Sequence, residues 1–276
     1  MNHRSWHLIP LIAGLLGIAC QSARTQPSQQ PQVIAVPQGD LAPPVPAPAM
    51  QAPAPESSAG PVRLSYNSCN VEGPYIALTF DDGPHATLTP KLLDLLKEKG
   101  VKATFFVLGE CVEANPDVLK RAAAEGHEIG NHSWDHKSFT KAGGSGVASE
   151  VNQTNAVIET ATGKKPVLVR PPGGATNSTI TRRLNTEFGL KVIMWDVDPL
   201  DWRFRTSARV TSEILKNTKA GSIILSHDIH ATTIDAMPAT IDGLLEKGFQ
   251  FVTVSELIAM DRPNPSVKPA PAAKPQ

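Results

Sequence analysis

The sequence predicts an α/β fold with a parallel β-sheet, either open or closed as a barrel. Between residues 75 and 260, seven strand-like segments alternate with seven helix-like segments, which is the pattern of repeated β-then-α units. The strand-like segments are nearly continuous apolar runs, as expected when both faces of a sheet are covered. Polar and charged residues follow directly after several of these runs. Parallel strands end at one edge of a sheet, so these residues should meet there.

Local signals justify each element in chain order. The expected strands are 75–80, 103–108, 128–130, 167–170, 191–195, 222–225 and 249–253, and the expected helices are 88–99, 116–125, 147–162, 178–188, 208–219, 234–247 and 254–260. The first helix carries leucines at helical spacing and ends before Gly100, and Asn115-Pro116 is a good opening for the second. Gly163, Gly189 and Gly221 close later helices.

The N-terminus has the layout of a secretory signal peptide over residues 1–19. A short basic start precedes an apolar stretch from Leu8 to Ala19, which is shorter than the ~20 residues that a spanning helix needs. Cys20 follows at the position where bacterial lipoproteins are lipidated, although Gly17 stands where that motif usually has leucine. We therefore expect either a lipid anchor on Cys20 or cleavage that releases a soluble protein. A weak N-terminal membrane anchor is the alternative to a signal peptide.

The folded part is predicted to span residues 62–261. Residues 20–61 are rich in Pro, Ala, Gln and Ser, which predicts an extended tether that cannot form a core, and 262–276 is predicted to be a disordered tail. The 26 basic and 26 acidic residues balance, so no charge excess indicates a nucleic-acid partner, and we expect a monomer. Cys69 precedes one strand and Cys111 follows the next, so we expect them at opposite ends of neighbouring strands and unpaired.

The first strand ends in two adjacent carboxylates, Asp81 and Asp82, followed by Gly83-Pro84. Neighbouring aspartates repel each other, so a bound cation or a shared proton is a common reason to keep them together. A solvated turn without a role is the alternative for this pair considered alone.

Further polar clusters follow four other predicted strands. His132 and His136 would share one face if their turn is helical, and with one carboxylate they could bind zinc and leave a position for water. Alone, such a histidine pair is usually a coincidence. The remaining clusters begin at Arg170, Asp196 and Leu225. Five polar clusters at five strand ends are hard to explain as structure.

These clusters together resemble the polysaccharide deacetylases, also called the NodB-homology domain or carbohydrate esterase family four. The five family motifs match residues 79–83, 132–136, 170–174, 198–202 and 225–228, in that order. The resemblance covers the whole predicted folded part. It implies a distorted (β/α) barrel of about seven parallel strands, with the catalytic face at the strand C-terminal ends.

The resemblance also implies a role for each matched residue. Asp82, His132 and His136 match the ligands of a divalent metal, most often Zn²⁺, with Co²⁺ or another transition metal as alternatives. Asp81 matches the general base, His227 the general acid, Arg170 the residue that holds the base, and Asp198 the carboxylate that orients the acid. Trp202 and Leu225 match residues that line the substrate pocket. Pro172 and Gly173 are the other expected substrate-side positions, although the family commonly has Tyr where this chain has Gly173, which would leave the pocket more open.

The function implied is metal-dependent removal of N-acetyl groups from an N-acetylglucosamine polymer at the cell envelope. Peptidoglycan and chitin-like chains are the leading substrates, and the tether favours peptidoglycan. One alternative is an O-acetyl esterase, as on xylan, because the same site could cleave esters. The other is a catalytically silent glycan-binding protein, although the chain keeps the matched ligands, base and acid.

Overall fold

The computed structural model describes residues 63–262. Its strands are β1 (Ser65–Tyr66), β2 (Tyr75–Asp81), β3 (Thr104–Val107), β4 (Glu128–Asn131), β5 (Leu168–Val169), β6 (Lys191–Ile193), β7 (Ile223–Ile224) and β8 (Gln250–Phe251). They form one sheet with the order β1-β6-β5-β4-β3-β2-β7, and β8 pairs with β2. Every pair of these strands is parallel. The predicted parallel α/β architecture is therefore confirmed.

The sheet curves back on itself through the segment that follows β6. Val197 forms a parallel bridge with Ile224 of β7, and its carbonyl accepts a 2.9 Å hydrogen bond from the backbone N–H of Leu225. The chain beyond β6 thus takes the place of a regular strand between β6 and β7. This irregular closure makes the barrel distorted, and it brings the C-terminal ends of β2, β4, β5 and β7 around one space.

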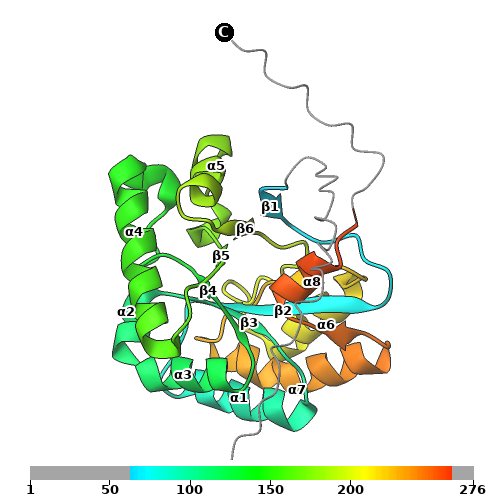
Figure 1. The fold of residues 1–276 in the computed structure, drawn as a ribbon. Coiled ribbons are helices and arrows are strands. Elements are labelled where there is room, and N and C mark those ends of the chain that lie inside the picture. The colour runs from blue at the N-terminus through cyan, green and yellow to red at the C-terminus, as the bar shows by residue number, and fades with distance from the viewer. Residues whose placement is uncertain (1–62, 263–276) are drawn as a thin grey trace, which may run out of the picture. The chain divides into compact units, whose positions relative to one another are not determined.

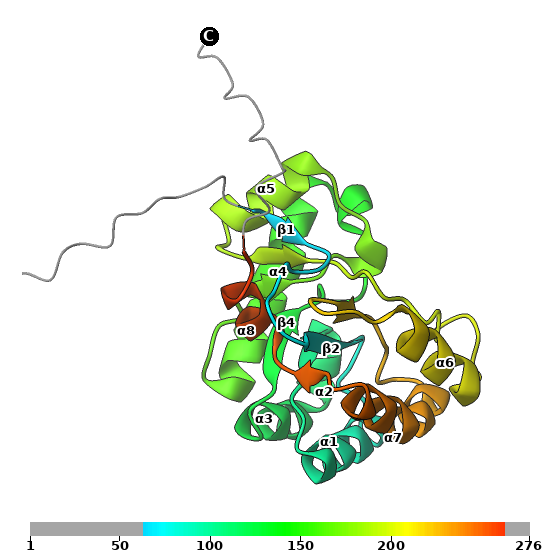
Figure 2. The same ribbon diagram turned by 90° about the vertical axis from the view of Figure 1, so that its right-hand side faces the viewer.

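Helices surround the sheet (Figures 1 and 2). They are α1 (Leu88–Lys99), α2 (Gly109–Ala114), α3 (Pro116–Ala124), α4 (Phe139–Thr162), α5 (Ser178–Thr186), α6 (Ser207–Asn217), α7 (Ala231–Glu246) and α8 (Val254–Ala259), with a short 3₁₀ turn at Pro172–Gly174. Leu92, Leu93 and Leu96 of α1 are fully buried in the main core. Burial of a leucine side chain typically stabilises a fold by roughly 1.5–3 kcal/mol, so this face fixes α1 against the sheet.

The structure differs from the predicted elements in three respects. β1 and α2 were not predicted, because two or six residues give too short a pattern to recognise. α4 begins at Phe139 rather than at residue 147, and it contains a non-helical glycine, Gly143 (φ 68°, ψ 178°). The turn from His132 to His136 is not helical, since Ser133 and His136 have positive φ angles of 74° and 63°.

The remaining predictions concern the cysteines and the chain termini, and only some of these residues are described by the structure. Cys69 and Cys111 are both free thiols, as expected. Among residues 63–262, no helix combines the length and the apolar character needed to cross a membrane. The predicted signal peptide, Cys20, the tether and the tail beyond Arg262 lie outside the described residues.

Candidate active site

A compact cluster of one carboxylate and two imidazoles lies beyond β2 and β4. Asp82 Oδ1 is 3.4 Å from His132 Nε2 and 3.6 Å from His136 Nε2. One potential ligand atom from each residue lies within 4.8 Å of the other two. The structure thus brings together the three residues that the sequence singled out as candidate ligands, but the helical turn suggested for the histidines was wrong. Left-handed backbone at Ser133 and His136 folds the loop so that both rings face Asp82.

The ring of His132 is fixed by a hydrogen bond on its other side. His132 Nδ1 lies 2.7 Å from the carbonyl oxygen of Arg170, and a carbonyl can only accept, so Nδ1 donates. In the neutral ring, this places the lone pair on Nε2, toward Asp82. A metal-binding histidine typically donates a hydrogen bond from its other ring nitrogen in this way.

Beside this cluster, Arg170 holds Asp81. Arg170 Nη1 donates to Asp81 Oδ1 at 2.7 Å and to Thr79 Oγ1 at 2.7 Å, and its Nη2 donates to the Met194 carbonyl at 3.0 Å. The guanidinium is completely buried, and its carbon lies 4.2 Å from the ring centre of Phe106. Asp81 is nearly as buried, and its Oδ2 lies 3.7 Å from His132 Nε2. One carboxylate oxygen is therefore occupied by Arg170, while the other faces the Asp82 cluster.

On the opposite side of the site, Asp201 rather than Asp198 holds His227. Asp201 Oδ1 lies 2.8 Å from His227 Nδ1, and Asp201 Oδ2 accepts from the His227 N–H at 2.9 Å and from Thr233 Oγ1 at 2.8 Å. Asp198 instead accepts the backbone N–H of Leu200 at 2.8 Å. The prediction for Asp198 was wrong: two aspartates share this loop, and the chain turns between them at Leu200, which has a positive φ of 56°.

The two sides of the site have opposite electrostatics. Burial alone would raise the pKa of Asp82, but the interaction with His132 and the charges of His227 and His136 lower it to about 2. Burial alone would lower the pKa of His227, but its hydrogen bond to Asp201 and the negative charges of Asp201, Asp81 and Asp82 raise it to about 9. Asp82 is therefore an anion and His227 a cation at neutral pH.

Known proteins share both the fold and this arrangement of elements. The family model described as polysaccharide deacetylase matches residues 69–193. A solved structure, the T48 deacetylase with substrate, is 43% identical and superposes with a TM-score of 0.65, covering 69% of this chain and 93% of that one. The chain belongs to the polysaccharide deacetylase family.

Two further family members show its range. The peptidoglycan-N-acetylglucosamine deacetylase PgdA of Listeria monocytogenes is 44% identical over 182 residues, which are 66% of this chain and 38% of that protein. The chain thus spans well under half of that relative. A family 4 acetyl xylan esterase from Clostridium thermocellum, solved with a cobalt ion, is 34% identical with a TM-score of 0.63, covering 67% of this chain and 90% of that one.

The family's metal fits the Asp82 cluster. Asp82 Oδ1 is buried and has no hydrogen-bond partner among the described residues, although it faces the Nε2 atoms of His132 and His136. Two ligands about 2.1 Å from a tetrahedral zinc ion lie roughly 3.4 Å apart, close to these separations. A cation would satisfy the three electron pairs that converge here. These residues therefore form a potential site for a divalent metal.

The four predicted substrate-side residues differ in exposure. The side chain of Trp202 is 49% exposed, whereas Leu225 and Pro172 are buried. Gly173 lies in the 3₁₀ turn with a φ of 59° and has open space where a side chain would be. Trp202 is therefore accessible for contact with a ligand and is not a core residue.

Asp228 is a buried carboxyl group for which sequence reasoning proposed no role. It is completely buried beside Gly83, where an added Cβ would lie 2.3 Å from Asp228 Oδ2. Thr89 Oγ1 donates to Oδ2 and itself accepts from the His85 N–H at 2.8 Å, so Asp228 holds the loop that follows Asp82. Burial raises its pKa to about 7, with the charges of Asp82 and Asp81 adding to the effect. Its position directly after His227 was the only signal in the sequence.

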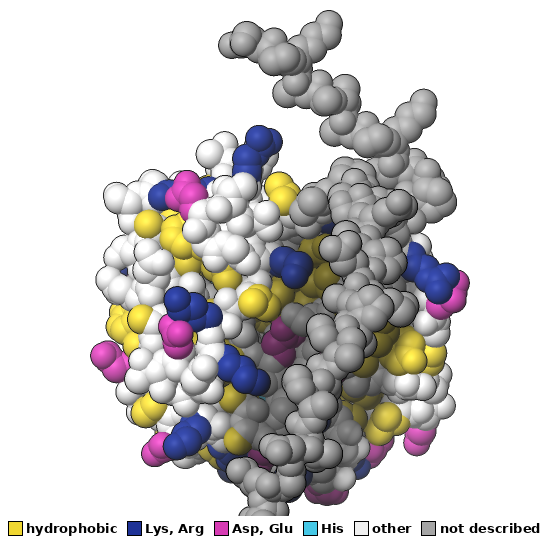
Figure 3. All heavy atoms as spheres, viewed as in Figure 1, with side chains coloured by type: hydrophobic (Ala, Val, Ile, Leu, Met, Phe, Trp, Pro, Cys, Tyr) yellow, Lys and Arg dark blue, Asp and Glu magenta, His cyan; other side chains and the backbone are white. Residues whose placement is uncertain are grey.

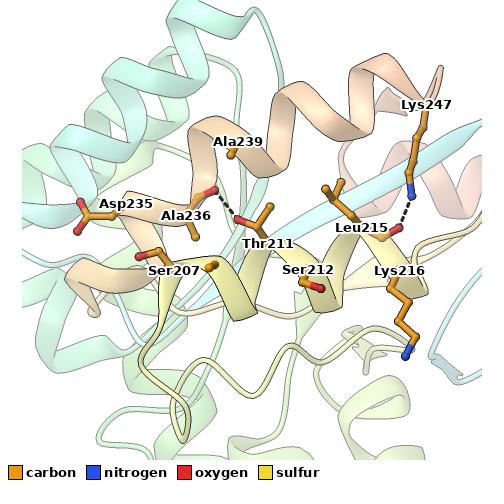
Figure 4. A pocket seen from close by; sticks show the side chains of 10 residues that line it. Ser207, Thr211, Ser212, Leu215, Lys216, Asp235, Ala236, Ala239 and Lys247 are labelled. Atoms are coloured by element: carbon orange, nitrogen blue, oxygen red, sulfur yellow. Dashed lines mark hydrogen bonds between the residues drawn. The ribbon is translucent and has the colours of Figure 1, made fainter.

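A separate groove of about 680 Å³ lies between α6 and α7 (Figure 4). It is lined mainly by small and polar side chains, and Thr211 Oγ1 joins its two walls by donating to the Ala236 carbonyl at 3.2 Å. None of the residues of the Asp82 cluster, the Arg170–Asp81 pair or the His227–Asp201 pair lines this groove. The chemistry is therefore concentrated at the strand ends.

Proposed function

We propose that this protein is a metal-dependent hydrolase that removes N-acetyl groups from a polysaccharide containing N-acetylglucosamine, with peptidoglycan as the leading substrate. The observation that carries the proposal is the position of Asp81, held by Arg170 beside the Asp82–His132–His136 cluster, with His227 held by Asp201 at the same site. A base, an acid and a metal site are the three parts that amide hydrolysis by water needs.

Asp82, His132 and His136 would hold the metal, which when bound would acidify water and polarise the acetyl carbonyl. Zn²⁺ suits a His₂Asp ligand set, and Co²⁺ is the alternative. Asp81 Oδ2 would take a proton from the attacking water, while Arg170 orients the carboxylate through its hydrogen bond to Oδ1.

His227 would donate the proton that the leaving nitrogen needs. Its Nδ1 is bonded to Asp201, so its Nε2–H is the proton available for transfer. Water adds its oxygen to the acetyl carbon, the C–N bond breaks, and the products are acetate and the free amine of the sugar. Asp201 stabilises the imidazolium before the transfer and holds the ring orientation afterwards.

Deacetylation should be tested by mass spectrometry of N-acetylglucosamine oligomers and purified peptidoglycan after incubation with the protein. Loss of 42 Da per acetyl group, abolished by a chelator and restored by Zn²⁺ or Co²⁺, is the expected result. Binding of both glycans without any mass change, with metal present, would instead support the silent glycan-binding alternative.

O-acetyl ester hydrolysis is a second candidate, favoured by the similarity to the acetyl xylan esterase. An ester needs less help from a general acid, because an alkoxide leaves more readily than an amide nitrogen. Rates on acetylated xylan and on N-acetylglucosamine oligomers, measured side by side, separate the two activities. A higher kcat/KM on xylan would replace the amide proposal.

We further propose an envelope location, supported by the signal-like N-terminus and by the peptidoglycan-modifying activity that names the Listeria relative. If Cys20 carries a lipid, Cys20→Ser should move the protein from the membrane to the soluble fraction. Equal solubility of wild type and Cys20→Ser would leave cleavage and release as the remaining route.

A further inference from the structure

Arg203 and Arg205 lie on the loop that leads from Asp201 into α6, and Arg209 lies in the first turn of that helix. Arg203, Arg205 and Arg209 are all exposed, and none has an ion-pair partner among residues 63–262. The arginines that do form ion pairs in this range are Arg63, Arg121, Arg170, Arg183 and Arg262. Unpaired guanidinium groups are thus concentrated on this loop, with Arg182 of α5 as the only other example in the described range. We call residues 202–209 the arginine loop.

The arginine loop is joined by a hydrogen bond to Asp201, the residue that holds the proposed catalytic acid. The N–H of Trp202 donates to Asp201 Oδ1 at 3.0 Å, the same oxygen that binds His227. The N–H of Phe204 donates to the Leu200 carbonyl at 2.8 Å. The guanidinium carbon of Arg209 lies 4.0 Å from the ring centre of Phe204, and that of Arg203 lies 5.1 Å from it. The guanidinium groups of Arg203 and Arg209 are therefore held against Phe204, on a segment that begins at the aspartate bonded to His227.

His230 connects the arginine loop with the acid. Its ring centre lies 5.9 Å from that of His227. Burial lowers the pKa of His230, and the positive charge of Arg205 lowers it further, so Arg205 is close enough to act on this ring. The charge of Arg205 therefore acts on the ring that neighbours His227.

Among residues 63–262, no carboxylate forms an ion pair with Arg203, Arg205 or Arg209. Asp201 is fully buried and already bonded to His227 and Thr233. Asp235 lines the α6–α7 groove (Figure 4) and forms no ion pair with the described part of the chain. By contrast, the face drawn in Figure 3 intersperses Lys and Arg with Asp and Glu. The arginine loop therefore presents uncompensated positive charge next to the site.

We propose that the arginine loop, through Arg203 and Arg205, forms a subsite that binds a carboxylate on the glycan beside the acetylated sugar. This inference rests on the proposed deacetylase function and narrows its substrate to an acidic glycan. Guanidinium groups bind carboxylates in a two-pronged geometry, and Trp202, half exposed at the start of the loop, offers a flat surface for the sugar. Peptidoglycan carries carboxylates on its lactyl groups or on its peptides, whereas chitin carries none.

The test compares the double variant R203Q/R205Q with wild type on three substrates. These are neutral chitin oligomers, peptidoglycan strands whose peptides have been removed to free the lactyl carboxylate, and strands that retain their peptides. We expect kcat/KM on at least one acidic substrate to fall about tenfold, from a few-fold for each exposed charge pair, with less than a twofold change on chitin oligomers. The acidic substrate that responds identifies the source of the carboxylate.

R182Q is the matched control, because Arg182 is also an arginine without an ion pair but belongs to α5. It should behave as wild type on every substrate, and the R203K/R205K variant should regain most of the activity that R203Q/R205Q loses. Arg209 is kept unchanged because it packs on Phe204. Raising the ionic strength should reduce the wild-type preference for the acidic strands and leave R203Q/R205Q nearly unaffected.

Equal losses on neutral and acidic substrates, or no loss on either, would overturn the subsite. Calorimetric affinity for the acidic strands, which requires no turnover, separates this outcome from a failure of the proposed function. If wild type deacetylates nothing yet binds acidic strands about tenfold more tightly than R203Q/R205Q does, the subsite stands and the deacetylase proposal fails. If affinity is the same in both proteins, the arginine loop is a solvated surface.

Discussion

The histidines on the two sides of the site are the same kind of side chain placed in opposite surroundings. His136, in the Asp82 cluster, has a pKa lowered by burial despite the charge of Asp82, which favours the neutral ring that can bind a metal. Desolvation acts in the same direction on His227, which is more buried than His136, but a carboxylate bonded directly to its ring raises its pKa to about 9. The partner atom, rather than burial, therefore decides whether a histidine here suits ligand chemistry or proton donation.

The largest expected effect comes from removing the carboxylate of the cluster. Asp82→Ala should lose both bound metal and activity, down to background, because two imidazoles alone hold a divalent ion weakly. Metal content measured by mass spectrometry beside kcat provides the check. Asp135→Ala is the control, since Asp135 lies in the same loop as the histidines but pairs with Lys137. A fully metallated, active Asp82→Ala variant would remove the cluster from the mechanism.

Asp81→Asn should distinguish the role of Asp81 as a base from the role of Asp82, His132 and His136 as metal ligands. Its amide oxygen can still accept from Arg170, but it cannot take a proton, so we expect normal metal content with kcat reduced on the order of 10²-fold or more. A thermal melt is needed beside the kinetics, because Arg170 is completely buried and loses its ionic partner. Loss of metal from Asp81→Asn with full metal in Asp82→Ala would show that the two roles are exchanged.

The partner of the proposed general acid, His227, can be tested by comparing variants of Asp201 and Asp198. Wild-type kcat/KM should fall as the pH rises through about 9, where His227 deprotonates. Asp201→Asn removes the negative charge, so the pKa of His227 should fall, this alkaline limb should shift to lower pH, and the rate at pH 8 should drop roughly 10- to 100-fold. Asp198→Asn should keep the wild-type profile within about twofold. The reverse result would restore Asp198 as the partner of His227.

The smallest expected effect concerns stability rather than rate. Asp228 has a folded pKa of about 7 against an ordinary value of 3.8, so the fold favours its protonated form. The contribution of protonated Asp228 to the free energy of unfolding is therefore fully present below about pH 4 and is lost as the pH rises through 7. Asp228→Asn stays neutral, so its Tm relative to wild type should rise by a few °C between pH 5 and pH 8.

Glu98→Gln on α1 is the control for that measurement, because Glu98 is exposed and forms no ion pair with the described residues. Its Tm difference from wild type should not change over the same pH range. A pH-independent difference for Asp228→Asn would show that this carboxyl group is already ionised in the fold at pH 5.

The sequence by itself determined the alternation of strands and helices, because each has its own period of apolar residues, and α1 matches its predicted bounds. It also determined which residues gather at the site, since parallel strands end at one edge and Asp81, His132, Arg170 and His227 all follow strands. Local pattern was sufficient for these features.

Only the tertiary structure decided which atoms meet. Asp201 rather than Asp198 reaches the histidine, beyond a turn in which Leu200 has a positive φ, and the approach of His136 to Asp82 depends on two more left-handed residues. Non-glycine residues adopt such angles when surrounding contacts impose them, so no local propensity could have predicted them. Likewise, only the tertiary structure shows that no carboxylate of the described residues forms an ion pair with Arg203 or Arg205.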